Sequence, residues 1–229
     1  MNIVIIGGSY GIGYSYYKKV KDKGDNIKIL SRTQGEVNVD DWIKFDIMKA
    51  LEEDRPLPET FDKIDSLIYL PGSIKLGLFS SFKKDDILND YKLNVLGAFE
   101  AVKAYRKELK KSDSASINFI SSIVAQTGMS LHSVVGMSKG ALEGLVRNLA
   151  AELAPKVRVN ALALSLVDTP LAKNITKNEK VLEKTIEKHP LKRIGNPDEV
   201  SDMLQVLTHF SPWLTGQVIT YDGGITSLR

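Results

Sequence analysis

The sequence contains no cysteine, which excludes disulfide bonds and cysteine-ligated metal sites. Its three histidines, His132, His189 and His209, lie far apart and lack the spacing of metal ligands, so we expect no metal. No apolar run approaches the ~18 residues of a membrane span, and the amino terminus leads straight into a strand without a signal-peptide pattern. With 31 Lys and Arg against 28 Asp and Glu, the charge is too balanced to indicate a nucleic-acid partner. We therefore expect a soluble cytoplasmic protein that binds neither nucleic acid nor membrane.

The first strand and the turn after it organise the rest of the chain. Residues 2–6 are an apolar, β-branched run typical of a strand buried on both faces, and a glycine-rich turn and a helical segment to Lys23 follow. This order places free helix N–H groups beside a strand end, an arrangement suited to the pyrophosphate of a dinucleotide. The residues that we expect to bind it are Gly7, Ser9, Tyr10, Gly11, Ile12 and Gly13. Such a turn can also serve packing alone, so by itself it leaves both interpretations open.

The end of the second strand, Ser31 and Arg32, bears on the choice of dinucleotide. An acidic residue at this place binds the ribose 2′-hydroxyl of NAD(H), whereas a nearby arginine accommodates the 2′-phosphate of NADP(H). The pair therefore favours NADP(H) over NAD(H). The alternative is that Arg32 is an ordinary surface residue.

Strands and helical segments alternate along the chain. We expect strands at 27–30, 42–45, 64–70, 115–120, 157–164 and 217–221. We expect helices at 82–110, at 134–153 and from Pro197, and only a short connection at 34–40. This alternation predicts an α/β fold, a Rossmann-type doubly wound parallel sheet in three αβα layers, with ligands at the carboxyl ends of the strands. A single domain would span residues 1–229.

The ordered motifs resemble those of the short-chain dehydrogenase/reductase family along essentially the whole chain. The glycine turn matches the family pattern Gly-x-x-x-Gly-x-Gly, and its later signatures are matched at 157–161, 168–170, 193–200 and 215–224. The resemblance implies an NAD(P)-dependent oxidoreductase that acts on a small carbonyl or alcohol substrate. It also implies further cofactor contacts at Asp46, Ile47, Gly72, Lys139, Val167 and Thr169.

The chemistry of that family needs a serine that orients the substrate, a tyrosine that exchanges a proton and a lysine that lowers the pKa of the tyrosine. Ser122 and Lys139 stand at the family's spacing. At the tyrosine position, four residues before Lys139, the sequence has Val135. No tyrosine occurs between Tyr105 and Tyr221, so a shift of register does not supply one. Residues that hold the cofactor are thus kept better than residues that transfer the proton.

Three hypotheses address the missing acid. His132, seven residues before Lys139, would share a face with it if the helix began that early, and a histidine exchanges protons near neutral pH; the alternative is an ordinary loop histidine. In the second hypothesis, water near Ser122 and Asn94 supplies the proton, since Asn94 matches the family's asparagine that holds a water of the proton relay. In the third, the chain binds NADP(H) without catalysis and acts as a partner or sensor subunit.

Two further expectations follow from the resemblance. The Lys- and Glu-rich segment at about 168–192 lies where the family covers its substrate, and its composition suggests a mobile helical lid. The small-residue helix 134–153 and the apolar stripe on 82–110 resemble the family's four-helix dimer contact, which implies a homodimer or homotetramer. The alternative is that both stripes pack on the sheet.

Overall fold

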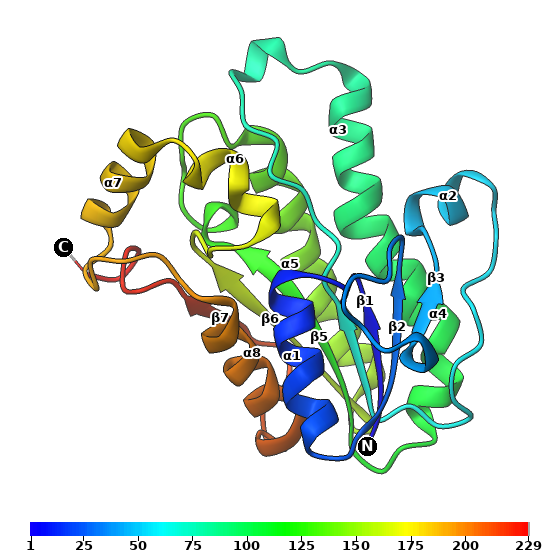
Figure 1. Ribbon diagram of the computed structural model, residues 1–229. Helices are drawn as coiled ribbons and strands as arrows, with labels where there is room; N and C mark the ends of the chain where they lie inside the picture. The colour runs from blue at the N-terminus through cyan, green and yellow to red at the C-terminus, as the bar shows by residue number, and fades with distance from the viewer. Residues whose placement is uncertain (229) are drawn as a thin grey trace.

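The computed structural model describes residues 1–228, whose strands form one sheet flanked by helices (Figure 1). The order is β3-β2-β1-β4-β5-β6-β7, and every neighbouring pair is parallel. The strands are β1 (Asn2–Ile6), β2 (Asn26–Ser31), β3 (Trp42–Lys44), β4 (Ser66–Tyr69), β5 (Ala115–Ser122), β6 (Val157–Leu164) and β7 (Val218–Tyr221). The α-helices are α1 (Gly11–Asp22), α2 (Ile47–Glu52), α3 (Lys84–Tyr91), α4 (Gly97–Lys110), α5 (Ser133–Leu153), α6 (Lys173–Thr176), α7 (Glu179–Lys188) and α8 (Pro197–Gln205). The predicted doubly wound α/β fold is confirmed.

Helices cover both faces of the sheet, as the apolar strand sequences require. In β1, Ile3 and Ile5 belong to a core shared with α1 and α8, whereas Val4 and Ile6 belong to a second core shared with α4 and α5. Neighbouring residues of a strand point to opposite faces, so one apolar run contributes to both cores. Within residues 1–228, no helix is both long and apolar enough to span a membrane.

The strand order places the expected ligand crevice beside β1. The chain moves outward from β1 to β2 and β3, then returns to add β4 on the other side of β1. This reversal is the switch point at which open α/β sheets bind ligands, at the carboxyl ends of the strands. In Figure 1 these ends lie toward the top of the view.

The helix predicted at 82–110 is interrupted by a π-helical turn, Lys92–Leu96, between α3 and α4. The wider turn changes the facing of the residues around it. Val95 and Val102 of the predicted apolar stripe are buried, whereas Tyr91 and Phe99 are exposed. The stripe is therefore divided between core and surface.

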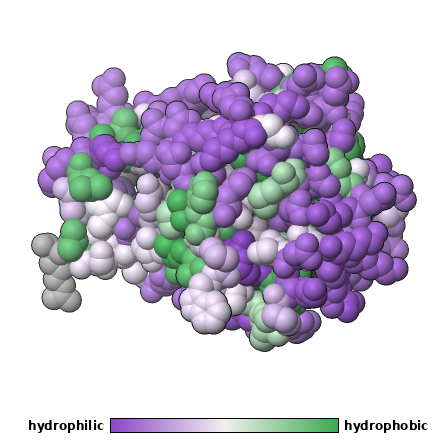
Figure 2. All heavy atoms as spheres, turned by 90° about the horizontal axis from the view of Figure 1, so that it is seen from below, coloured by the Kyte–Doolittle hydropathy of each residue, from purple (hydrophilic) through white to green (hydrophobic). Residues whose placement is uncertain are grey.

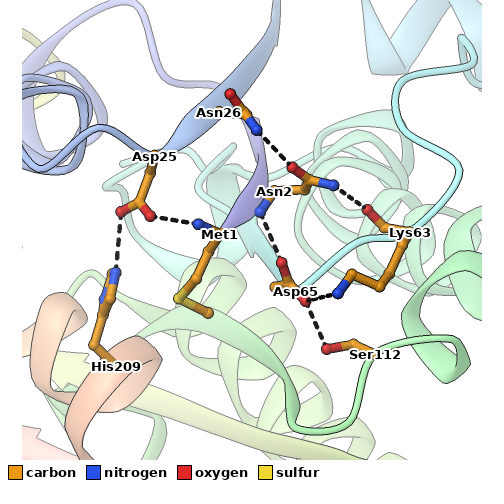
Figure 3. Close-up of polar contacts among 8 residues, drawn as sticks. All are labelled: Met1, Asn2, Asp25, Asn26, Lys63, Asp65, Ser112 and His209. Carbon is orange, nitrogen blue, oxygen red and sulfur yellow. Dashed lines mark hydrogen bonds and ion pairs between the residues drawn. The ribbon is translucent and has the colours of Figure 1, made fainter.

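A polar network fastens the amino ends of the strands (Figure 3). The terminal amine of Met1 contacts Asp25 at 2.6 Å, and His209 lies 3.1 Å from the same carboxylate. Asp65 accepts hydrogen bonds from the backbone of Asn2 at 2.8 Å and from Ser112 Oγ at 2.7 Å. The surface at this end of the molecule is largely hydrophilic (Figure 2).

Candidate functional site

The glycine turn brings the amino end of α1 against β1. Gly11 has φ +54°, and a Cβ on it would lie 3.3 Å from two side-chain carbons of Thr169. A Cβ on Gly13 would lie 2.6 Å from Gly8 Cα, which is closer than any carbon can approach without a backbone shift. Tyr10 precedes α1, and its side chain does not cap the helix. The first N–H groups of α1 therefore stay open to a ligand. The turn thus has the open donors and close packing of an anion site.

A second group of residues meets at Gly72, just beyond β4. A Cβ on this residue would lie 3.3 Å from Asn94 Oδ1 and 3.4 Å from Lys139 Nζ. Its neighbour Pro71 backs the turn, because a Cβ on Gly7 would lie 3.1 Å from the Pro71 ring. Residues from the first turn, the loop after β4, the π-helical turn and α5 therefore converge on one edge of the sheet.

Lys139 is a buried cation in this group. Its Nζ donates a hydrogen bond to the Ile120 carbonyl oxygen at 2.8 Å, near the end of β5. Burial lowers the pKa of Lys139 to about 8, and the opposing influence of Asp90 favours the ammonium form. At neutral pH the side chain is mainly charged and keeps N–H groups for a ligand.

Asn94 is wholly buried and carries an open acceptor. Its Nδ2 donates to the Asp90 carbonyl oxygen at 2.9 Å, which fixes the direction of the amide. Its Oδ1 has no hydrogen-bond partner in the described part of the chain. A buried amide oxygen without a partner is costly, so a water or ligand hydroxyl at this position would satisfy it.

Ser122 is the last residue of β5, two residues beyond the carbonyl that binds Lys139. Its Oγ donates to the Leu164 carbonyl oxygen at 3.3 Å and accepts from the Val124 N–H at 3.4 Å. Both contacts are long, and the side chain is only half-buried, so the hydroxyl remains able to bind another group. Val135, one turn before Lys139 on α5, is buried and offers no hydroxyl.

His132 lies apart from these side chains. It precedes α5, and its Nδ1 lies 2.7 Å from the Ser130 carbonyl oxygen. It lines a hollow of about 500 Å³ with residues such as Met129 and Met137, and neither Ser122, Asn94 nor Lys139 lines that hollow. Asn94 and Lys139 therefore meet at Gly72, whereas within residues 1–228 the hydrogen bond of His132 goes to Ser130 and not to either of them.

At the end of β2, Ser31 has a structural role. Its buried Oγ lies 2.5 Å from Ser9 Oγ and accepts from Trp42 Nε1 at 3.0 Å, so it ties the glycine turn to β2 and β3. Arg32, the next residue, is exposed at the same strand end. Of the two side chains, the charged one, Arg32, is the one exposed to solvent.

The remaining predicted contacts lie around the same edge. Asp46 is the N-cap of α2 and accepts from the Met48 N–H at 3.0 Å through Oδ1. Ile47 and Val167 are buried, and Ile12 is half-buried. The side chains of these three apolar residues serve packing, so contact with a cofactor would use their backbone groups.

The segment after β6 contains a 3-10 turn, Pro170–Ala172, followed by α6 and α7, and no residue of α7 is buried. His189, directly after α7, fixes the carboxyl end of that helix. From the sequence, this residue is assessed only as a metal ligand, and its spacing argues against that role. His189 is buried, with Nε2 2.8 Å from Ser165 Oγ and Nδ1 2.7 Å from the Thr185 carbonyl oxygen. Within residues 1–228, no group of His, Asp or Glu is placed to hold a metal ion.

The chain is similar to known reductases and dehydrogenases over nearly its whole length. A family model described as Enoyl-(Acyl carrier protein) reductase matches residues 11–226. Carbonyl reductase family member 4 of Danio rerio is 32% identical, with 98% of each chain covered. A short chain dehydrogenase family protein from Francisella tularensis superposes with a TM-score of 0.87 at 25% identity, covering 99% of this chain and 98% of the other.

One similar structure contains a nucleotide. A variant of ElxO with NADPH bound superposes with a TM-score of 0.84 at 25% identity, covering 99% of this chain and 98% of that chain. The family match, the strand order and the convergence of residues at the switch point agree. This chain belongs to the short-chain dehydrogenase/reductase family.

Proposed function

We propose that this protein is an NADP(H)-preferring oxidoreductase that acts on a small carbonyl or alcohol substrate and has an altered proton-transfer site. The observation that carries the proposal is the meeting of Asn94 Oδ1 and Lys139 Nζ at Gly72, beside the open amino end of α1. Asn94 Oδ1 is a buried acceptor that lacks a partner within residues 1–228, and Lys139 is a buried cation. The amino end of α1 supplies anion-binding N–H groups. These are the complementary parts that a dinucleotide requires.

The residues fit a dinucleotide along its length. The glycine turn and the first N–H groups of α1 would hold the pyrophosphate, and Lys139 would hold ribose hydroxyls. Thr169, packed against Gly11, would close the site from the side of β6. Bound NADP(H) supplies hydride transfer to or from a carbonyl carbon.

The preference for NADP(H) rests on Arg32. This guanidinium is exposed at the end of β2, where the chain has no acidic side chain to bind a 2′-hydroxyl. The Ser31 hydroxyl is hydrogen-bonded to Ser9 and Trp42, so it is not available to bind the nucleotide. A 2′-phosphate would pair with the charge of Arg32.

The substrate oxygen would bind Ser122, whose two hydrogen bonds are long. Val135 provides no proton at the position where the family has tyrosine, so the proton must come from water near Ser122 and Asn94 or from another side chain. Loss of a positioned acid typically lowers the rate by about 10²–10⁴-fold. Slow turnover is therefore expected. We further propose that residues 168–192, with the exposed helix α7, form the lid over this substrate.

The burial of Val135 favours a second function, in which the chain binds NADP(H) without turnover and serves as a partner or sensor subunit. Both functions need the same cofactor site, and they differ only in catalysis. The test is fluorescence titration with NADPH and NADH, followed by NADPH oxidation on a panel of carbonyl compounds.

Two variants accompany the wild type. Carbonyl-dependent oxidation that Ser122→Ala reduces at least about tenfold supports the oxidoreductase and excludes the sensor. Loss of turnover in His132→Ala would place the acid on His132, although within residues 1–228 no hydrogen bond links this residue to Ser122, Asn94 or Lys139. Tight NADPH binding with no turnover on any compound supports the sensor function.

A further inference from the structure

Asp90, in the last turn of α3, is a buried carboxyl that the proposed chemistry does not use. It is 4% exposed. Its Oδ1 accepts a hydrogen bond from Ser73 Oγ, and its Oδ2 is buried without a partner within residues 1–228. A carboxylate in such a place is costly unless a cation balances it. We therefore ask which cation balances the charge of Asp90.

Neighbouring contacts lead from Asp90 to Lys139. The backbone carbonyl of Asp90 accepts from Asn94 Nδ2 at 2.9 Å. Ser73, which donates to its carboxylate, directly follows Gly72, and the Cβ position of Gly72 lies 3.4 Å from Lys139 Nζ. Both buried charges therefore lie against two consecutive residues of the loop after β4.

The other polar groups near Lys139 are either neutral or hydrogen-bonded to other side chains. Asn94 in the π-helical turn and Ser122 at the end of β5 are neutral at all relevant pH values. Glu143, one turn further along α5, accepts hydrogen bonds from Ser121 Oγ at 2.7 Å and from Gln126 Nε2 at 3.3 Å. Asp90, whose Oδ2 is buried without a partner within residues 1–228, is the carboxyl in this cluster that is left to balance the ammonium, and its charge raises the pKa of Lys139.

We propose that Asp90 is a positioning residue that keeps Lys139 in its ammonium form inside the cofactor site. The carboxylate acts through the lysine and does not itself touch substrate or cofactor. Its effect on nucleotide binding and turnover rests on the proposed function, whereas the coupling between the two charges exists without any ligand. This separation lets the two proposals fail independently.

The experiment measures the charge of Lys139 directly in the ligand-free protein. Lysine is isotope-labelled at Cε, the Lys139 signal is assigned by its absence in Lys139→Arg, and its chemical shift is followed by NMR as pH rises. The wild type should titrate near pH 8. Asp90→Asn should titrate roughly one unit lower, because an opposite charge nearby shifts a pKa by about 1–3 units.

Asp85→Asn is the matched control. It removes the same charge from the same helix, but Asp85 is exposed in the first turn. We expect its Lys139 titration to match the wild type. An equal titration in Asp90→Asn and the wild type would overturn the proposal, as would an equal shift in both variants.

A second measurement needs no folded variant. In the wild type, the Cγ shift of labelled Asp90 should change at the pH at which Lys139 loses its proton. Absence of that step would overturn the proposal even if Asp90→Asn failed to fold.

Nucleotide binding then tests the consequence. Asp90→Asn should bind NADPH like the wild type at pH 6 and up to about fivefold more weakly at pH 8, where about half of the wild-type lysine but only about a tenth of the variant's is charged. A weakening of equal size at both pH values would indicate a merely structural role. If neither protein binds nucleotide, the proposed function fails while the NMR result still decides the coupling.

Discussion

Asn94 and Lys139 come from different elements and meet at Gly72, in the space that a side chain there would occupy. The Cβ position of Gly72 lies 3.3 Å from Asn94 Oδ1 and 3.4 Å from Lys139 Nζ. One side chain offers an acceptor without a partner, and the other offers a cation with spare N–H groups. A side chain at position 72 would crowd both groups, and under the proposed function this space holds ribose hydroxyls.

The charge of Lys139 predicts a pH dependence of nucleotide binding. Burial lowers the pKa of Lys139 to about 8, so the ammonium prevails below this pH and the neutral amine above it. Affinity for NADPH should be constant from pH 6 to 7 and should fall as pH rises through 8, because the cation that attracts the nucleotide is lost. Fluorescence titration measures this change. Lys139→Met should bind weakly with a flat profile, and an equally steep profile in that variant would assign the pH dependence to another group.

Gly13→Ala should destabilise the fold and the anion site together. Its Cβ would lie 2.6 Å from Gly8 Cα and 2.7 Å from Leu70 Cδ1, and the backbone contact has no room to relax. We expect a loss of about 1–3 kcal/mol in the free energy of urea-induced unfolding.

Gly144→Ala is the control for that substitution. Gly144 is also helical, but nothing lies within 4 Å of its Cβ position. Alanine should stabilise α5 by about 0.5–1 kcal/mol. Equal effects of the two substitutions would contradict the close approach of α1 to β1.

Arg32→Ser should alter the choice of nucleotide. Removing the exposed guanidinium takes away the partner of a 2′-phosphate, and a lost charge-assisted bond of this kind costs about 1.5–3 kcal/mol. We expect NADPH to bind roughly tenfold to a hundredfold more weakly, while NADH binding stays unchanged. Parallel titrations with both nucleotides give the ratio of the NADPH and NADH affinities. If the substitution leaves this ratio unchanged, Arg32 is an ordinary surface residue.

The lowered pKa of Asp65 predicts that the folded protein loses stability when this carboxylate is protonated in acid. Burial alone would raise the pKa of Asp65, but the Ser112 hydroxyl, the Asn2 N–H and the charge of Lys63 hold it below its usual value. The folded state thus favours the carboxylate, so this stabilisation is present above the unfolded-state pKa and is lost as pH falls through the folded-state pKa.

Asp65→Asn isolates that contribution. We expect it to lower the free energy of unfolding by about 1–3 kcal/mol at pH 7, and by clearly less at pH 3. Urea unfolding at the two pH values measures the difference. A loss of the same size at both would mean that packing, not charge, is what the substitution removes.

Many bounds of the strands and helices could be predicted from the local sequence. β1 and β6 begin and end at the predicted residues, because each is a continuous apolar run bounded by polar or turn residues. α8 begins at the predicted Pro197, and Asn196 caps it by accepting from the Asp198 N–H at 2.9 Å. The short connection before β3 contains only a 3-10 turn, Val39–Asp41.

Other features depend on contacts between distant segments. The π-helical turn at Lys92–Leu96 has no propensity signal, because its residues suit an ordinary α-helix equally well. Nothing in the sequence distinguishes Asp90 from a surface aspartate, and only the fold shows that it is buried and that one of its carboxyl oxygens lacks a partner within residues 1–228. The role of Ser31 likewise could not be predicted from the sequence, because it depends on hydrogen bonds to Ser9 and Trp42.

The most direct test of the account is the binding of NADPH to the wild type and to Lys139→Met at pH 7, followed by fluorescence. The account predicts saturable binding at one site per chain, tighter for NADPH than for NADH, and at least about tenfold weaker in the variant. Absence of binding by either nucleotide to the folded wild type would contradict the cofactor site itself. Equal affinity of the wild type and the variant would remove Lys139 from it.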